Sequence, residues 1–552
     1  MSEIIELNIQ GMHCANCETT VQRALATVPG VEQVEVPDWR QGKATVQLGE
    51  GADTAPILSA LKQVGYPGAI NSTAAPLINP ATISSGDHDF DLLVIGAGSA
   101  GFAAAIKGVD LGFRVGLVGY GALGGTCVNI GCVPSKTLIR AAEAWHSVGH
   151  HPFNGITTQQ VGIDWPAVKA QKDSLVATMR QTKYADVLAA YPAITYLEGQ
   201  AAFQPDGALN VGGQTYSAAK YVIATGARPF MAAIPGLEQA APLNSTTLME
   251  LDELPESLII LGGRAIALEL GQTMARLGVR VSILQRSASL VPDHEPEIGK
   301  AIQAFLEQEG LSVITGVDIS RVEIRDDQRV VHTTLNEEEK EFVADQILVA
   351  WGRQPNTEAL GLENVGVETT GAGAITVNEF MQSTNPSIFA AGDVTPLPEY
   401  VYVAASSAAL AAQNALSGDA TALDLTAMPG VIFSDPQIAT VGLTEAQSRA
   451  QGYAVKTSLL DLEHVARARA AHDTRGFIKL VADESSDRLL GAHILAAEAG
   501  EVIQSAVLAI KFGITLRELT GTLFPYLTQV EGLKLAAQAF DKDVALLSCC
   551  AG

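Results

Sequence analysis

The chain has 552 residues, too many for a single hydrophobic core, so several domains are expected. A formal net charge of −25 argues against nucleic acid or anionic membrane as a partner, because phosphate binding needs clustered cations. The start, MSEIIELNIQ, lacks the basic residues and apolar run of a secretory signal, and later apolar runs are short and interrupted by glycine. These features predict a cytoplasmic protein with no membrane insertion.

The first 68 residues are expected to form a small domain of their own. A strand-like run, IIELNI, precedes a helical stretch over residues 18–28, in which Val21, Leu25 and Val28 share one face. Two further alternating runs, VEQVEV and ATVQL, and a second helical stretch, APILSALKQVG, follow. This order predicts a ferredoxin-like βαββαβ domain over residues 1–68.

A second domain is expected to begin at Asp89. It is preceded by residues 69–88, which are rich in Ser, Thr, Ala, Asn and Pro and are expected to be a flexible linker. From Asp89 onward, an apolar strand, a glycine turn, a helix and a second strand form a βαβ unit, with Gly96, Gly98 and Gly101 at the GxGxxG positions. Such glycines let the backbone approach a pyrophosphate at the helix N-terminus, so a dinucleotide site is predicted.

A second βαβ unit has the sequence SLIILGGRAIALELGQTMARLGVRVSILQRS. Gly262 is present, but Arg264 and Ala267 occupy the later glycine positions. Its second strand ends at Gln285 and Arg286, without the acidic residue that binds a ribose hydroxyl. The positive charge of Arg286 favours a coenzyme with a 2′-phosphate and hence NADPH. The alternative is that Arg286 is a solvated surface charge.

All six cysteines occur in close pairs. In a reducing cytoplasm, such pairs are more often redox or metal sites than structural staples. The pairs are Cys14 with Cys17, Cys127 with Cys132, and Cys549 with Cys550.

The stretch GGTCVNIGCVPSK, residues 124–136, resembles the redox-disulfide signature of the flavin-dependent pyridine nucleotide-disulfide oxidoreductases. The motifs ATGARP, GRQPN and TNPSIFAAGDV follow in the order found in that family. The resemblance implies an α/β, glutathione-reductase-like fold with a split FAD domain, an inserted NADPH domain and a C-terminal α+β dimerisation domain. The expected boundaries are 89–240 and 360–425 for FAD, 241–359 for NADPH and 426–552 for dimerisation with a cysteine tail.

The resemblance also implies roles for individual residues. Cys132 is expected to lie against the flavin as a thiolate and Cys127 to be the exchanging thiol, with a plain structural disulfide as the alternative. A helix beginning near PSKTLIRAAEA is expected to lower the thiol pKa. Lys136 is expected to approach the flavin and to pair with Glu269. Further FAD-binding positions implied by the motifs are Gly125, Thr126, Thr225, Gly226 and Asp393.

Two positions depart from the family pattern. Gly119 stands where an acidic residue usually binds the FAD adenosine ribose, so that contact is expected to be weaker or water-mediated. Phe524 stands where disulfide reductases have the histidine that protonates a leaving thiol, and it is followed by Pro525, Tyr526 and, farther on, Glu531. The chain is therefore expected to cleave organic disulfides poorly.

The remaining cysteine pairs are suited to a soft metal ion. GMHCANC resembles the GMxCxxC loop of heavy-metal-associated domains, in which Cys14 and Cys17 would bind a linear or trigonal ion. Zinc would need more ligands than His13 adds, and a thioredoxin-like redox role is the alternative. A disulfide between the adjacent Cys549 and Cys550 would be strained, so this tail is expected to stay reduced and to pass a thiophilic ion to the inner cysteines.

The full set of features resembles the branch of this family that reduces Hg(II). That resemblance implies FAD, NADPH and thiol-bound Hg(II) as substrate, with Hg(0) as product. Tyr526 and Tyr184 match tyrosines near the inner metal site, with aromatic packing as the alternative for Tyr184. It also implies a homodimer in which the tail of one subunit serves the other, and a membrane mercury transporter as a further partner. The alternatives are a large-type thioredoxin reductase or other NADPH-dependent disulfide reductase, and a metal chaperone or sensor.

Overall fold

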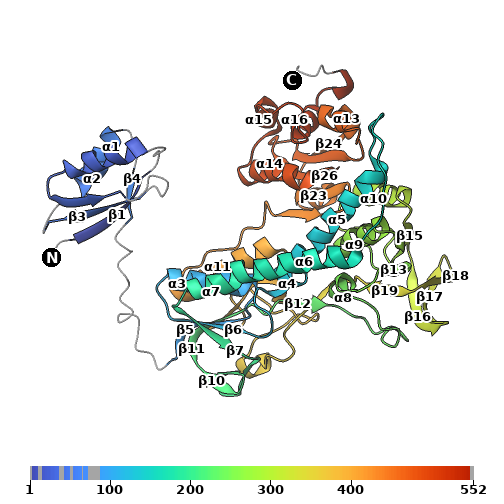
Figure 1. The fold of residues 1–552 in the computed structure, drawn as a ribbon, viewed down its shortest axis with the longest axis horizontal. Helices are drawn as coiled ribbons and strands as arrows, with labels where there is room; N and C mark the ends of the chain where they lie inside the picture. The colour runs from blue at the N-terminus through green and yellow to red at the C-terminus, as the bar shows by residue number, and fades with distance from the viewer. Residues whose placement is uncertain are drawn as a thin grey trace. The chain divides into compact units, whose positions relative to one another are not determined.

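The computed structural model describes residues 3–9, 15–36, 43–49, 54–64, 66, 68–71 and 88–546. The chain divides into two compact units, one within Met1–His88 and the other comprising most of Asp89–Gly552 (Figure 1). Within the described ranges, no helix combines the length and the hydropathy that a membrane crossing requires.

The N-terminal unit is a four-stranded antiparallel sheet with two helices. The strands have the order β2-β3-β1-β4, which is the ferredoxin-like topology expected from the sequence. Val21, Leu25 and Val28 are buried in its core, as their helical spacing predicted. Its elements are β1 (Glu3–Ile9), α1 (Ala15–Ala26), β2 (Val31–Glu35), β3 (Lys43–Leu48), α2 (Ala55–Gln63) and β4 (Gly68–Asn71).

The predicted end of this domain at residue 68 is too early. The strand Gly68–Asn71 pairs with β1 through Leu7↔Ile70 and its neighbours, so the sheet extends into the segment predicted as linker. The short run GAIN offers no alternation that could be recognised before its partner strand is known.

The FAD-binding part is built on a five-stranded parallel sheet of order β21-β11-β5-β6-β7. The strand β5 has side chains buried on both faces, as parallel central strands do. Leu92 and Val94 face the cluster that includes helices α3 and α11, whereas Leu93 and Ile95 face a small antiparallel sheet, β10-β9-β8. Its elements are β5 (Phe90–Ile95), α3 (Ser99–Asp110), β6 (Val115–Gly119), α4 (Gly125–Asn129), α5 (Cys132–His150), α6 (Trp165–Arg180), the π-helix η3 (Gln181–Ala185), α7 (Asp186–Ala190), β7 (Ile194–Glu198), β8 (Ala201–Phe203), β9 (Leu209–Val211), β10 (Gln214–Tyr216), β11 (Ala218–Ile223), β12 (Ala227–Pro229), β20 (Arg353–Pro355), η4 (Leu362–Val365), β21 (Ile388–Ala390), η5 (Gly392–Val394) and α11 (Val401–Ser417).

A second parallel sheet, of order β15-β14-β13-β19, is inserted between β12 and β20. It repeats the plan of the first sheet, because Leu258 and Ile260 face the cluster with helices α9 and α10, and Ile259 and Leu261 face the antiparallel sheet β16-β17-β18. Its elements are α8 (Ser245–Met249), β13 (Ser257–Leu261), α9 (Ala265–Arg276), β14 (Arg280–Gln285), α10 (Pro296–Gln308), β15 (Ser312–Thr315), β16 (Asp318–Arg325), β17 (Gln328–Leu335), β18 (Glu338–Ala344) and β19 (Gln346–Val349).

The C-terminal part is an antiparallel sheet of order β22-β23-β26-β25-β24, covered by α14 and α16. The structure thus has the split nucleotide-binding architecture and α+β C-terminal domain that the sequence predicted. The elements are β22 (Pro429–Ile432), β23 (Gln437–Gly442), α12 (Glu445–Ala450), β24 (Val455–Asp461), η6 (Leu462–His464), α13 (Ala466–Ala471), β25 (Phe477–Asp483), β26 (Leu489–Ala496), α14 (Ala499–Lys511), α15 (Leu516–Gly521), α16 (Glu531–Gln538) and η7 (Val544–Leu546).

Candidate functional site

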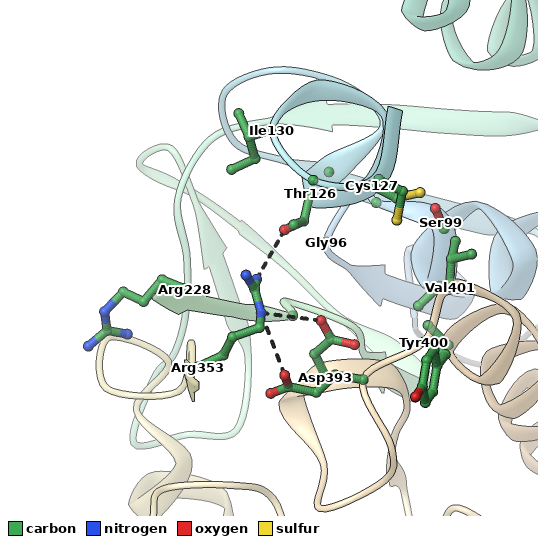
Figure 2. Close-up of a pocket in the computed structure, with 18 of the residues that line it drawn as sticks. Gly96, Ser99, Thr126, Cys127, Ile130, Arg228, Arg353, Asp393, Tyr400 and Val401 are labelled. Carbon is green, nitrogen blue, oxygen red and sulfur yellow. Dashed lines mark hydrogen bonds and ion pairs between the residues drawn. The ribbon is translucent and has the colours of Figure 1, made fainter. Parts of the chain in front are cut away.

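A cavity of about 990 Å³ lies where the FAD-binding part meets the inserted domain and the C-terminal sheet (Figure 2). Its lining includes the glycine turn after β5, helix α4, the first turns of α5 and α9, the start of α11 and strand β22. Most of the FAD positions predicted from sequence line it, namely Gly96, Gly98, Gly125, Thr126, Lys136, Thr225, Gly226 and Asp393.

The glycine turn leaves bare backbone at the N-terminus of α3. Gly96 has φ +118°, and a Cβ there would overlap the carbonyl of Ala224. A Cβ on Gly125 would lie 2.8 Å from the Cα of Gly98, and one on Gly101 would overlap the carbonyl of Gly96. Because side chains are excluded here and free N–H groups begin the helix, the site fits the pyrophosphate of FAD.

Cys127 and Cys132 both line this cavity. Cys127 lies in the short helix α4, and Cys132 is the first residue of α5 and is exposed to the cavity. The pKa of Cys132 is lowered to about 7, first by a hydrogen bond from the Cys127 thiol and further by the charge of Lys136, against the effect of burial. The pKa of Cys127 is raised by the same hydrogen bond. The thiolate therefore resides on Cys132, the sulfur predicted to face the flavin.

Lys136 is held by two groups from different domains. Its Nζ lies 2.7 Å from Oε2 of Glu269 and 4.7 Å from the ring centroid of Phe433. Glu269 is nearly buried, and its other oxygen accepts a hydrogen bond of 2.9 Å from the backbone N–H of Phe433. The ion pair expected from the resemblance is thus present, and it links α5 of the FAD-binding part to α9 of the inserted domain.

Sequence reasoning missed a cluster of charged groups around Asp393. Arg353, which follows directly on the inserted domain, places Nε 3.8 Å from Oδ2 of Asp393 and 3.9 Å from Oε2 of Glu399 (Figure 2). Its Nη2 donates to Oγ1 of Thr126 over 3.3 Å. Burial raises the pKa of Asp393 and of Glu399, and Arg353 opposes both shifts. The GRQPN motif already contained Arg353, but its partners depend on the tertiary fold.

Tyr184 packs against Gly124, near the start of α4, and its Oη lies 2.9 Å from Oγ of Ser99. It sits on the π-helix η3, a rare geometry that often occurs at functional sites. Burial raises the pKa of Tyr184, a hydrogen bond with Ser99 lowers it, and the nearby sulfurs of Cys127 and Cys132 raise it. Tyr184 therefore contacts Ser99, which lines the cavity, but it is not itself among the described residues that line it, and its role stays a prediction.

Tyr526 lies elsewhere on the same chain. It is 50% exposed in the loop between α15 and α16, and it is not among the described residues that line the cavity. Cys14, Cys549 and Cys550 lie outside the described residues, and Cys17 belongs to α1 with its side chain outside that description. Their metal-binding roles stay predictions.

The glycine at the end of β6 has a structural reason. A Cβ on Gly119 would overlap the hydroxyl and ring of Tyr196, which comes from the neighbouring strand β7. An acidic side chain at this position would require the Tyr196 side chain to move. The next residue, Tyr120, is 78% exposed and lines the cavity.

The glycine turn of the inserted domain has Arg264 at the position that Gly98 occupies in the first βαβ unit. Gly262 has φ +127°, and a Cβ there would overlap the carbonyl of Ala350, so close packing of turn and strand is retained. Arg264 forms an ion pair with Asp293. Arg286 is exposed directly after β14, and its contact with a 2′-phosphate stays a prediction.

Comparison with known proteins gives the class first. The family profile described as pyridine nucleotide-disulphide oxidoreductase matches residues 90–408, the dimerisation domain of the same family matches residues 428–537, and the heavy-metal-associated domain matches residues 6–67. The chain therefore belongs to the pyridine nucleotide-disulphide oxidoreductases and carries an N-terminal heavy-metal-associated domain. Membership implies FAD and a pyridine nucleotide as cofactors, and the dimerisation domain implies a homodimer.

Individual relatives are more specific. The chain is 44% identical to a mercuric reductase of Staphylococcus aureus and 42% identical to one of Lysinibacillus sphaericus, in each case over 99% of both chains. Among solved structures, the HOCl-induced flavoprotein disulfide reductase RclA from Escherichia coli, as a Cu(II) complex, is similar with a TM-score of 0.73 and 29% identity. That match covers 81% of this chain and 99% of the other.

Proposed function

We propose that this protein is an NADPH-dependent flavoenzyme that reduces thiol-bound Hg(II) to Hg(0) in the cytoplasm. One observation carries the proposal: a cysteine pair, with its thiolate on Cys132, opens into the FAD cavity of a chain that has Phe524 in place of a catalytic histidine. Likeness to mercuric reductases over nearly the full length supports it. A thioredoxin or other disulfide reductase is not favoured, because its leaving thiol would need that histidine.

With Hg(II) as the substrate, the enzyme needs no general acid at the position of Phe524. In the reaction NADPH + Hg(SR)₂ → NADP⁺ + Hg(0) + RS⁻ + RSH, the metal receives both electrons and no proton is transferred to it. FAD, when bound, supplies the electron pair that it receives from NADPH. Cys127 and Cys132 hold the soft cation through sulfur, which is the ligand type it prefers. Lys136 stabilises the negative charge on Cys132 and is itself held in place by Glu269.

The assay that tests the proposal compares electron acceptors. Purified protein with NADPH and excess small thiol should oxidise NADPH when Hg(II) is added, and should respond little to glutathione disulfide, lipoamide or thioredoxin. Rapid turnover of any of these three, with no response to Hg(II), would overturn the proposal.

We assign metal delivery to the C-terminal cysteine pair and to the N-terminal heavy-metal-associated domain. Replacing Cys549 and Cys550 by alanine should slow steady-state use of Hg(II) and leave the rate of flavin reduction by NADPH unchanged. Cys14 and Cys17 would receive Hg(II), with a membrane mercury transporter as the proposed donor. Unchanged Hg(II) turnover in the tail variant would contradict the relay.

A further inference from the structure

Gln272 forms hydrogen bonds with both main-chain polar groups of a single residue in the C-terminal part. Its Oε1 accepts from the N–H of Asp435 over 2.8 Å, and its Nε2 donates to the carbonyl of Asp435 over 2.8 Å. The same Nε2 lies 3.1 Å from Oε1 of Glu309. Gln272 belongs to α9 and is only 3% exposed. Because a primary amide carries both a donor and an acceptor, it can bind both groups of Asp435 at once, which neither a carboxylate nor a hydrocarbon side chain can do.

This amide clamp holds a segment that reaches the FAD cavity. Asp435 lies in the connection between β22 and β23, just after Phe433, which lines the cavity. The N–H of Phe433 donates to Oε1 of Glu269 over 2.9 Å. Glu269 and Gln272 are one turn apart on the same face of α9, so the helix holds the main chain of this segment at two successive points.

The same segment determines the surroundings of Lys136. Its Nζ lies 2.7 Å from Oε2 of Glu269 and 4.7 Å from the ring centroid of Phe433. A shift of the segment would remove the N–H donor from Glu269 and the aromatic face from Lys136. Since Lys136 lines the FAD cavity, its position decides how strongly its positive charge acts there.

We propose that Gln272 is a positioning residue: by clamping the main chain of Asp435, it keeps Phe433 on Glu269 and so holds the charge of Lys136 at the flavin. The inference rests on the proposed flavoenzyme function through FAD binding in this cavity, but not on mercury as the acceptor. A nearby cation favours the reduced, more electron-rich flavin, so the position of Lys136 contributes to the reduction potential of FAD.

The test is the midpoint potential of FAD in the holoenzyme, measured by reductive titration against a dye of known potential and without mercury. Cys127 and Cys132 are both replaced by serine in every sample, so that their disulfide takes up no electrons. Lys136→Met should lower the potential, because the cation is lost. Gln272→Met, which keeps the length of the side chain but forms neither hydrogen bond, should lower it by part of that shift. The double variant should shift no more than Lys136→Met alone, since Gln272 acts through Lys136.

Asn414→Leu is the matched control, because Asn414 is a second buried amide that clamps one residue. It is 4% exposed, accepts from the N–H of Thr421 over 3.2 Å and donates to the carbonyl of Thr421 over 2.9 Å. It is not among the described residues that line the cavity. Asn414→Leu and Gln272→Met should both lower the urea midpoint of unfolding, because each leaves buried main-chain groups without a partner. Only Gln272→Met should lower the FAD potential.

Three results would each overturn the inference: an unchanged FAD potential in Gln272→Met, a shift of equal size in Asn414→Leu, or additive shifts in the double variant. Should Gln272→Met fail to retain FAD, Gln272→Asn, whose amide is one methylene shorter, should lower the potential in its place. A protein that reduces no Hg(II) can still show these shifts, so failure of the proposed function is distinguishable.

Discussion

Replacing Lys136 by methionine should weaken the Cys132 thiolate by a measurable amount. The pKa of Cys132 is lowered to about 7 by the Cys127 hydrogen bond and then by the charge of Lys136. A neighbouring cation lowers the pKa of an acidic group by roughly one to three units. Because Lys136 is partly exposed to solvent, we expect its charge to lower the pKa of Cys132 by about one unit. The midpoint should therefore rise from about 7 to roughly 8.

The consequence at neutral pH follows from the titration. With a pKa of about 7, half of Cys132 is thiolate at that pH. With a pKa of roughly 8, about one tenth is thiolate, so reactions that need the thiolate should slow about fivefold. The rate of alkylation of the reduced protein by iodoacetamide, measured against pH, reports this fraction directly. Above the new midpoint the rates of the variant and the unaltered protein should converge.

Glu269→Gln is the matched control, because it removes the partner of Lys136 and keeps the cation. The carboxylate of Glu269 raises the pKa of Cys132, so its removal should leave the midpoint at or below that of the unaltered protein. Equal upward shifts of the midpoint in both variants, or a midpoint that stays near 7 in Lys136→Met, would contradict a direct effect of the Lys136 charge on Cys132.

Three further changes test other parts of the structure. Gly119→Asp should lower the free energy of unfolding in urea by about 1–3 kcal/mol, because the new side chain overlaps Tyr196. Adding Tyr196→Ala should restore much of that stability, and additive losses in the double variant would contradict the overlap. Arg276→Met should lower the free energy of unfolding by about 3 kcal/mol. The nearly buried Glu309 would lose its closest cation, which lies 2.6 Å away, and an unchanged urea midpoint would contradict this. Removing residues 1–88 should leave Hg(II) turnover nearly intact in dilute, thiol-rich assays, and loss of FAD from the truncated protein would contradict the independence of the two units.

The parts of the fold that depend on local pattern could be predicted from the sequence. The strand β5, the glycine turn and α3 follow one another within a short stretch, so periodicity and the glycine spacing were sufficient. The strand Gly68–Asn71 was missed because only its pairing with β1 defines it. Likewise, the π-helix around Tyr184 has no distinguishing signal in QTKYA.

The chemistry of the site was predicted where one motif contained it. Cys127, Cys132 and Lys136 come from a single stretch, and their family pattern extended to Glu269. Contacts between residues far apart in the chain were not predictable from spacing. The partners of Arg353, the ring of Phe433 on Lys136 and the hydroxyl of Ser99 on Tyr184 all depend on how separate domains or distant elements meet.

The most direct measurement of the central claim is the ratio of Hg(0) released to NADPH consumed by the purified holoenzyme. Protein is mixed anaerobically with limiting NADPH, Hg(II) and excess small thiol, and volatile mercury is collected from the gas phase and quantified. One Hg(0) is expected for each NADPH, and Cys132→Ser is expected to release none. NADPH consumption without volatile mercury would contradict this expectation.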